Sequence, residues 1–271
     1  MTIIQAIILG IVQGVTEFLP VSSSGHLVLM SQLFGVREQS IVFEVIVHVG
    51  TLLAVLAVFR SEVKLLAASL VKLVGNPKQA KVLLRQDSGC RLLVALVVGT
   101  LPAVAVALLL KNQVERLFSS SLAAGVMLIV TGFVLFAAEK RAAGSRSDPS
   151  LLDALLIGCG QAVAVLPGLS RSGTTIAVGL FRGLDRQSAA RFSFLLSVPA
   201  ILGALVLSLL DLFSGTVTLG AGVLISGLIS AAVTGYLAIR FFLAMLRKGK
   251  LVWFSYYTWL VGAVIIVVHM L

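Results

Sequence analysis

The stretch QGVTEFLPVSSSGH at residues 13–26 places a carboxylate, three serines and a histidine inside a region otherwise rich in leucine, valine, isoleucine and alanine. Polar and ionisable groups at membrane depth are costly, and they usually serve a function. The stretch therefore bears on both the fold and the function. It marks where an apolar segment turns, at Pro20, and it marks where chemistry is expected.

The composition around this stretch is that of a membrane protein. Of 271 residues, 59% are hydrophobic and only 12% are charged, whereas a soluble domain has about 25% charged residues. Long apolar runs favour helices over a barrel, which needs alternating residues. The start MTIIQAIILG lacks the basic residues and cleavage site of a secretory signal. The net charge of +10 is attributed to cytoplasmic loops rather than to nucleic-acid binding.

Six apolar stretches are long enough to cross a bilayer, which takes about 20 helical residues. They run approximately over 41–59, 92–110, 117–138, 192–213, 217–239 and 251–271. Two further apolar regions, 2–34 and 151–181, are broken by LPVSSSGH and LPGLSRSGTT. A half-helix of about 10–15 residues reaches only part of the way through a bilayer. We therefore predict an all-α polytopic membrane protein with six transmembrane helices and two re-entrant helical hairpins, whose tips are buried in protein or line a wet cavity.

The distribution of basic residues predicts the orientation of the chain in the membrane. Of the 21 lysines and arginines, 17 fall in four segments that this topology places on one side of the membrane. The four segments are 60–91, 140–146, 182–191 and 240–250. The other side carries only Arg37, Lys111 and Arg116. Because basic loops stay in the cytoplasm, the first hairpin is expected to enter from outside and the second from the cytoplasm.

The two broken regions resemble each other. Gln13 precedes Gly25 by 12 residues, and Gln161 precedes Gly173 by the same interval, so the offset between them is 148. The following spans, which begin at Phe43 and at residue 192, repeat at an offset of 149. We predict one membrane domain, 1–271, built from inverted repeats at approximately 1–139 and 150–271 joined by a cytoplasmic loop. Such repeats place a site at the midplane and are commonest in transporters.

The polar tips suit an anion. In each, a turn rich in glycine and serine leads into a new helix, whose free amides and dipole attract phosphate. Helix capping alone is the ordinary explanation for a single serine, but whole clusters favour a binding site. The candidate substrate-binding residues are Gln13, Ser22, Ser24, Gly25, Ser170, Ser172, Gly173, Thr174 and Thr175.

Four residues carry the predicted chemistry. Arg171 needs a phosphate or carboxylate partner at membrane depth, and its planar fork fits phosphate oxygens. Glu17 lies four residues after Gln13 on one helix face. It is expected to hold a divalent cation such as Mg²⁺ or Ca²⁺, to act as a general base, or to pair with Arg171. Ser23 and His26 are candidates for nucleophile and for acid or base.

Several residues outside the two tips also have expected roles. Glu44 is expected at an interface or in the cavity wall, and His48 is interpreted as a structural hydrogen-bonding residue. The two cysteines, Cys90 and Cys159, match no metal spacing and are read as small fillers. Small residues in 222–230 can pack spans inside one chain or between two chains of a homodimer.

At these residues the sequence resembles a known family. QGVTEFLPVSSSGH is similar to the E/Q-x-x-x-E-F-x-P-x-S-S-S/T-G-H motif of bacterial undecaprenyl-pyrophosphate phosphatases of the bacitracin-resistance type. LPGLSRSGTTI resembles their second motif, P-G-x-S-R-S-x-x-T, and FEVIVHVGT resembles the segment after the first motif. The likeness covers almost the whole chain.

The resemblance implies a function. Such enzymes remove the terminal phosphate of a C55 isoprenoid diphosphate at the outer face of the bacterial plasma membrane, which regenerates the carrier for cell-wall precursors. It implies divalent-metal dependence and functional roles for Glu17, Ser23, His26 and Arg171, with Ser170 and Thr175 in support. Gln13 replaces an acidic residue of the motif, which weakens any mechanism that needs two carboxylates there. Attack by Ser23 and attack by water activated by His26 both remain open.

Three rival functions fit less well. An inverted repeat with an anion site also suits a transporter or lipid flippase. A vanadium-haloperoxidase-like lipid phosphatase requires a histidine where this chain has Ala177. An intramembrane serine protease has no use for Arg171 or for two anion sites.

Overall fold

The computed structural model describes residues 1–34, 41–110, 113, 120–141, 144–212 and 219–270. Across these residues the backbone is helical apart from turns and one isolated bridge between Arg146 and Leu184. This confirms the predicted all-helical class. The cations Arg37, Lys111 and Arg116, which were assigned to the outer loops, lie outside the described residues.

Each predicted hairpin is a pair of short helices separated by a turn. The pairs are α1 (Ile3–Phe18) with α2 (Ser23–Leu33), and α9 (Leu151–Val163) with α10 (Arg171–Phe181). Thr2 caps α1 and Ser150 caps α9, each in a capping box that satisfies two backbone amides. α1 ends before Leu19, because the ring of Pro20 disfavours a helical residue ahead of it. The breaks lie where the sequence predicted them, and re-entry into the membrane stays a prediction.

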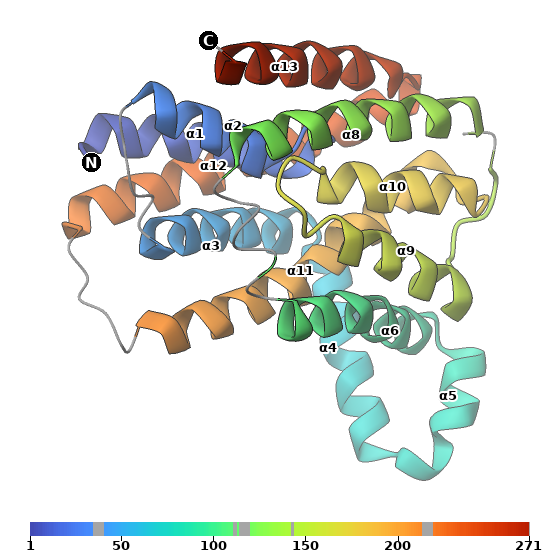
Figure 1. Cartoon of the computed structure of the whole chain (residues 1–271). Helices are drawn as coiled ribbons and strands as arrows, with labels where there is room; N and C mark the ends of the chain where they lie inside the picture. The colour runs from blue at the N-terminus through green and yellow to red at the C-terminus, as the bar shows by residue number, and fades with distance from the viewer. Residues whose placement is uncertain (35–40, 111–112, 114–119, 142–143, 213–218, 271) are drawn as a thin grey trace.

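Five helices of the described residues are long and apolar enough to cross a membrane. They are α6 (Ser88–Leu109), α8 (Ser121–Arg141), α11 (Arg186–Leu212), α12 (Ala221–Lys248) and α13 (Val252–Met270). A sixth candidate is α3 (Ile41–Val58), which is followed by α4 (Arg60–Gly75) after a bend of 87°. In Figure 1, α8 and α13 lie side by side along one edge of the molecule, while α4 projects from the opposite edge. The chain is thus a multi-pass helical membrane protein.

Two helices extend well beyond the approximate spans predicted for them. The span predicted at 217–239 continues as α12 to residue 248, because no helix-terminating residue occurs before Gly249, which ends it with a φ of +59°. The span predicted at 192–213 begins earlier, at Arg186, where the Asp185 carboxylate accepts a hydrogen bond from a backbone amide of the first turn. The segment between α4 and α6 contains a 3₁₀ turn, Pro77–Gln79, and α5, Ala80–Gln86.

Small residues allow the first helix of each pair to lie very close to a span. A Cβ atom added to Gly10 of α1 would be 2.4 Å from the Ser230 hydroxyl of α12. A Cβ atom added to Gly158 of α9 would be 2.2 Å from the carbonyl oxygen of Gly99 in α6. The sequence allowed Ser230 to pack either inside one chain or between two chains. In the structure it packs within the chain.

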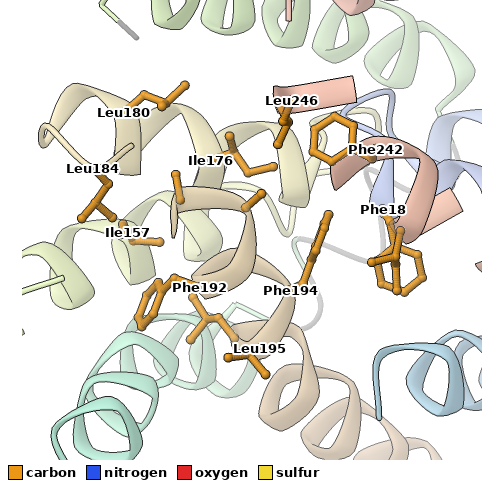
Figure 2. Packing of buried hydrophobic residues seen from close by; sticks show 14 of the residues in the cluster. Phe18, Ile157, Ile176, Leu180, Leu184, Phe192, Phe194, Leu195, Phe242 and Leu246 are labelled. Carbon is orange, nitrogen blue, oxygen red and sulfur yellow. The ribbon is translucent and has the colours of Figure 1, made fainter. Parts of the chain in front are cut away.

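The largest buried cluster joins both hairpins to α11 and α12. Figure 2 shows Phe18 at the end of α1, Phe194 of α11 and Phe242 of α12 next to one another, with Ile176 of α10 close by. The rings of Phe18 and Phe194 meet edge to face at 5.5 Å. Edge-to-face aromatic pairs contribute about 0.5–1.5 kcal/mol beyond their burial. Because Phe18 follows Glu17 in the chain, this packing holds the turn that carries the polar residues.

Candidate active site

The two turns have matching local structure. In the first, the Ser22 hydroxyl accepts a hydrogen bond of 3.3 Å from the Gly25 amide at the start of α2. In the second, the Ser170 hydroxyl accepts one of 3.1 Å from the Gly173 amide at the start of α10. Ser22 has a φ of +67°, which is uncommon for a residue other than glycine. Ser22 and Ser170 thus act as helix caps at equivalent positions, and both helix starts face the other turn.

The serine two residues after each capping serine binds the backbone of the opposite turn. The Gly168 amide donates to the Ser24 hydroxyl at 3.2 Å. The Ser172 hydroxyl donates to the Leu19 carbonyl at 3.1 Å. These two bonds lock the hairpin tips together. Ser24 and Ser172, which the sequence suggested as substrate ligands, therefore use their hydroxyls to join the tips in this structure.

Glu17 connects the polar groups of both hairpins. Its Oε2 atom accepts hydrogen bonds from Ser23 Oγ at 2.7 Å and from Gln13 Nε2 at 3.0 Å. Its Oε1 atom accepts a hydrogen bond from Arg171 Nη2, which also forms an ion pair. The carboxylate is buried, with only 7% of the side chain exposed. Of the four residues predicted to carry the chemistry, the structure thus brings Glu17, Ser23 and Arg171 into contact, with the predicted substrate ligand Gln13 beside them.

A cavity of about 350 Å³ opens beside these groups. One part of its wall is polar and includes Glu17, Ser23 and Arg171. Another part is apolar and comes from the second turn and from α11, through the side chains Ala164, Val165, Leu169, Ala200, Ile201, Ala204 and Leu205. The cavity therefore offers charge at one place and an apolar surface at another.

Arg171 has donor capacity left after it binds Glu17. Its Nη1 atom is buried and has no hydrogen-bond partner within the described residues. A guanidinium has five N–H donors in a fixed fork, and an unsatisfied buried donor is costly. Since Arg171 lines the cavity, a phosphate oxygen there would satisfy this donor.

His26 lies behind the first turn and is not among the residues that line the cavity. Its Nδ1 atom is 2.8 Å from the Ser22 carbonyl oxygen, and its Nε2 atom is 2.7 Å from the Tyr257 hydroxyl of α13. Because a carbonyl can only accept, Nδ1 must carry the proton and Nε2 accepts from Tyr257. Both ring nitrogens are thus occupied, and in this structure His26 supports the Ser22 turn. Sequence reasoning missed Tyr257, for which no local signal exists.

His48 of α3, by contrast, faces the site. Its Nδ1 atom donates to the Glu44 carbonyl at 2.7 Å, so the structural hydrogen bond expected from the sequence is present. Its Nε2 atom is 3.9 Å from Glu17 Oε2, and both His48 and Glu44 line the cavity. The sequence did hold a signal, namely two polar residues four apart on one face of a span.

The remaining predicted ligands are Thr174, Thr175 and two glycines, Gly25 of the first tip and Gly173 of the second. The Thr175 hydroxyl donates to the Arg171 carbonyl at 2.8 Å and pairs with Ser193 at 2.6 Å. It therefore braces the helix that carries Arg171. The Thr174 hydroxyl is buried without a hydrogen-bond partner in the described part of the chain. Gly25 and Gly173 serve close packing, since a Cβ atom on either would lie 3.1 Å from a neighbouring side chain.

The side chains alone do not fit a resident metal ion. The described residues contain no group of three or more His, Cys, Asp or Glu side chains placed to hold one. Both oxygens of Glu17, the predicted ligand, are already engaged by protein donors. Divalent Mg²⁺ and Ca²⁺ need several oxygen ligands, which this site does not supply by itself.

Fold and site together define a class: a multi-pass helical membrane protein with a buried serine, carboxylate and guanidinium beside an apolar cavity. Residues 6–264 match the family described as bacitracin resistance protein BacA, and the chain belongs to this family. A relative from Carboxydothermus hydrogenoformans, named undecaprenyl-diphosphatase, is 43% identical over 271 residues, which cover 98% of this chain and 97% of the relative.

Two further relatives carry the same name. The one from Desulforapulum autotrophicum is 44% identical over 272 residues, covering 98% of both chains. The one from Methanobrevibacter smithii is 44% identical over 271 residues, covering 98% of this chain and 97% of that protein. The likeness therefore extends over full-length proteins, as the two motifs implied.

Proposed function

We infer that this membrane protein is an undecaprenyl-diphosphatase. It hydrolyses the terminal phosphate of undecaprenyl diphosphate to give undecaprenyl phosphate and inorganic phosphate, which recycles a lipid carrier of cell-wall synthesis and fits a role in bacitracin resistance. The observation that carries the inference is the contact of Glu17 with both Ser23 and Arg171 at the polar wall of the cavity.

The cavity chemistry supports a lipid diphosphate as substrate. We propose that the diphosphate lies between the N-termini of α2 and α10, where helix dipoles favour anions. The free Nη1 atom of Arg171 would bind a phosphate oxygen. The apolar wall that includes Val165 and Ile201 would receive the first isoprene units of the tail.

We propose that Ser23 is the nucleophile and Glu17 its general base. Glu17 Oε2 already accepts the Ser23 hydroxyl hydrogen, so it takes this proton as Oγ attacks the terminal phosphorus. The bond from that phosphorus to the bridging oxygen then breaks, and its electron pair leaves on undecaprenyl phosphate. Arg171 stabilises the charge that develops on the phosphoryl oxygens. Water next hydrolyses the phosphoserine, releases inorganic phosphate and restores Ser23.

Direct attack by water remains the alternative mechanism. In that case Ser23 orients the phosphate and Glu17 or His48, which both face the cavity, accepts the proton of the water. His26 is less suited to this role, because its Nε2 atom is bonded to Tyr257. Substantial turnover by Ser23→Ala would support the water mechanism and exclude the phosphoserine.

A divalent metal requirement stays a proposal. Because the protein offers too few free ligands, Mg²⁺ or Ca²⁺ would have to be held largely by the oxygens of the diphosphate. Phosphate release before and after chelation tests this. Full activity in excess chelator would exclude the requirement.

We also propose that the two halves are inverted repeats. The packing supports this: α1 lies against α12 as its counterpart α9 lies against α6, and α8 pairs with its own counterpart α13. Such an arrangement favours transport or flipping of an anionic lipid as a second candidate function. A fluorescent polyprenyl phosphate in proteoliposomes would reveal transfer between leaflets.

The expected setting is the bacterial inner membrane, with the cavity open to the outer side, in keeping with the distribution of basic residues. We also propose a homodimer, which a mass measurement in detergent would test. Impermeant labelling of a cysteine at Val45, which lines the cavity, would check the orientation in whole cells.

The main test uses purified protein and a long-chain polyprenyl diphosphate. Native protein is expected to release inorganic phosphate, and Arg171→Ala is expected to lose this activity. Arg240, an exposed arginine that binds Tyr236 on α12, provides the matched control as Arg240→Ala. Folded native protein that releases no phosphate under any metal condition would refute the assignment and favour the transporter.

A further inference from the structure

The segment between α3 and α6 has a geometry unlike that of the spans. α4 bends 87° away from α3 at Phe59. A helix nearly perpendicular to a span runs along the membrane surface rather than through it. In Figure 1, α4 and α5 extend downward, away from the layers formed by the other helices. The segment therefore extends beyond the body of the protein.

Contacts with the start of α6 fix α4 at the level where α6 begins. Lys72 Nζ donates to the Asp87 carboxylate at 2.6 Å, and the same carboxylate caps α6 by accepting from two of its backbone amides. Ser69 of α4 is buried, and a Cβ atom on Gly89 of α6 would lie 2.3 Å from its hydroxyl. Since α3 ends and α6 begins here, α4 lies at a membrane boundary.

One face of α4 exposes a stripe of large apolar side chains. Leu70 is 53% exposed, Val71 is 73% exposed and Val74 is 72% exposed. At 100° per residue these three positions fall within about 100° of the helix circumference. Val82 of α5 adds a further apolar side chain that is 51% exposed. No other part of the described chain covers this stripe.

Basic residues flank the stripe. Besides Lys72, which is paired with Asp87, the exposed cations of the segment are Arg60, Lys64, Lys78, Lys81 and Arg85. Its two acidic residues, Glu62 and Asp87, are both paired, with Arg191 and Lys72 respectively. The exposed charge is therefore positive. An apolar stripe bordered by lysine and arginine is typical of helices that lie in the interface of a membrane with anionic lipids.

We propose that α4 and α5 form an amphipathic hairpin that lies on the adjacent membrane leaflet and binds anionic lipid headgroups. The stripe of Leu70, Val71 and Val74 enters the boundary between headgroups and acyl chains. Lys78 and Lys81 contact the headgroup phosphates, since polybasic segments are attracted to anionic leaflets. The membrane is the natural occupant of this face because the spans on both sides of the segment place it there.

The test measures the depth of two positions on α4 in proteoliposomes. A nitroxide is attached to a cysteine introduced by Val74→Cys, or by Ala68→Cys as the matched control, in a Cys159→Ser background. Ala68 is also exposed but lies about 120° from Val74 around the helix. Relaxation by oxygen, which partitions into lipid, is compared with relaxation by a water-soluble nickel chelate.

In vesicles that contain phosphatidylglycerol, oxygen is expected to dominate at position 74 and the nickel chelate at position 68. Equal access of the chelate to both would overturn the proposal, because the stripe would then be open to water or to a protein partner. The double variant Lys78→Gln, Lys81→Gln is expected to place the label at position 74 at a shallower depth in the membrane, in anionic vesicles only. The measured sign is a lower ratio of relaxation by oxygen to relaxation by the nickel chelate. No difference between anionic and neutral vesicles would overturn the role of headgroup charge.

Discussion

The buried pair of Glu17 and Arg171 offers the sharpest test of the site. The two side chains are only 7% and 17% exposed, and they come from different hairpins. Removing one partner of a buried ion pair leaves the other charge without compensation, which costs about 3–5 kcal/mol. Glu17→Gln and Arg171→Gln, which keep the approximate shape, are each expected to lower the free energy of unfolding by about this amount.

The double variant separates structure from catalysis. With both charges removed, no uncompensated charge remains, so its stability loss is expected to fall short of the sum of the single losses by about 0.5–3 kcal/mol. Catalysis follows a different pattern. Glu17 is the proposed general base, and loss of a general base costs about 10²–10⁴ in rate, so Glu17→Gln and the double variant are both expected to lose activity by about this factor.

The assay combines unfolding in mixed micelles, followed by circular dichroism, with phosphate release at saturating lipid. The matched control is the pair Glu139 and Arg186, which joins α8 to α11 through two hydrogen bonds away from the cavity. Its variants are expected to lose stability and to keep kcat. The reasoning is refuted if the Glu17 and Arg171 losses add within about 0.5 kcal/mol, or if Glu17→Gln retains kcat near that of the native protein.

Three further predictions follow from packing and charge. Tyr257→Phe removes the hydroxyl that binds His26, so kcat is expected to fall by about fivefold, which corresponds to the roughly 1 kcal/mol of one hydrogen bond, with KM unchanged; unaltered steady-state kinetics would contradict this. Gly14→Ala places a Cβ atom 2.0 Å from a threonine of α12, whereas Gly75→Ala meets nothing within 4 Å; detergent unfolding is expected to show a loss of about 1–3 kcal/mol for the first only. The lysine ammonium on α4 holds the pKa of Asp87 below its ordinary value of 3.8. The ion pair therefore stabilises the junction of α4 with α6 at pH values above 3.8, and this stabilisation is lost as the pH falls through the lowered pKa of Asp87. Faster amide exchange at the start of α6 in acid, absent in Asp87→Asn, would verify this pH dependence.

Local signals in the sequence were sufficient for the helices and for the polar turns. Apolar runs predicted the spans, and Pro20 with the serines predicted the first break, because these features act within a few residues of where they occur. The ends of the helices depended on more than the apolar runs. The end of α12 depended on Gly249 rather than on the first basic residue, since a helix can continue into the headgroup region with charged side chains.

The sequence by itself determined that this is a helical membrane protein with two polar hairpin tips, and its motifs identified Glu17, Ser23, His26 and Arg171 as a group. Only the tertiary structure decided how they act. It paired Arg171 with Glu17, directed His26 to Tyr257 rather than to Ser23, and brought His48 to the cavity. These choices depend on contacts between residues as much as 231 positions apart. Hydrogen-bond geometry is set where helices meet in space, and residue spacing along the chain does not encode it.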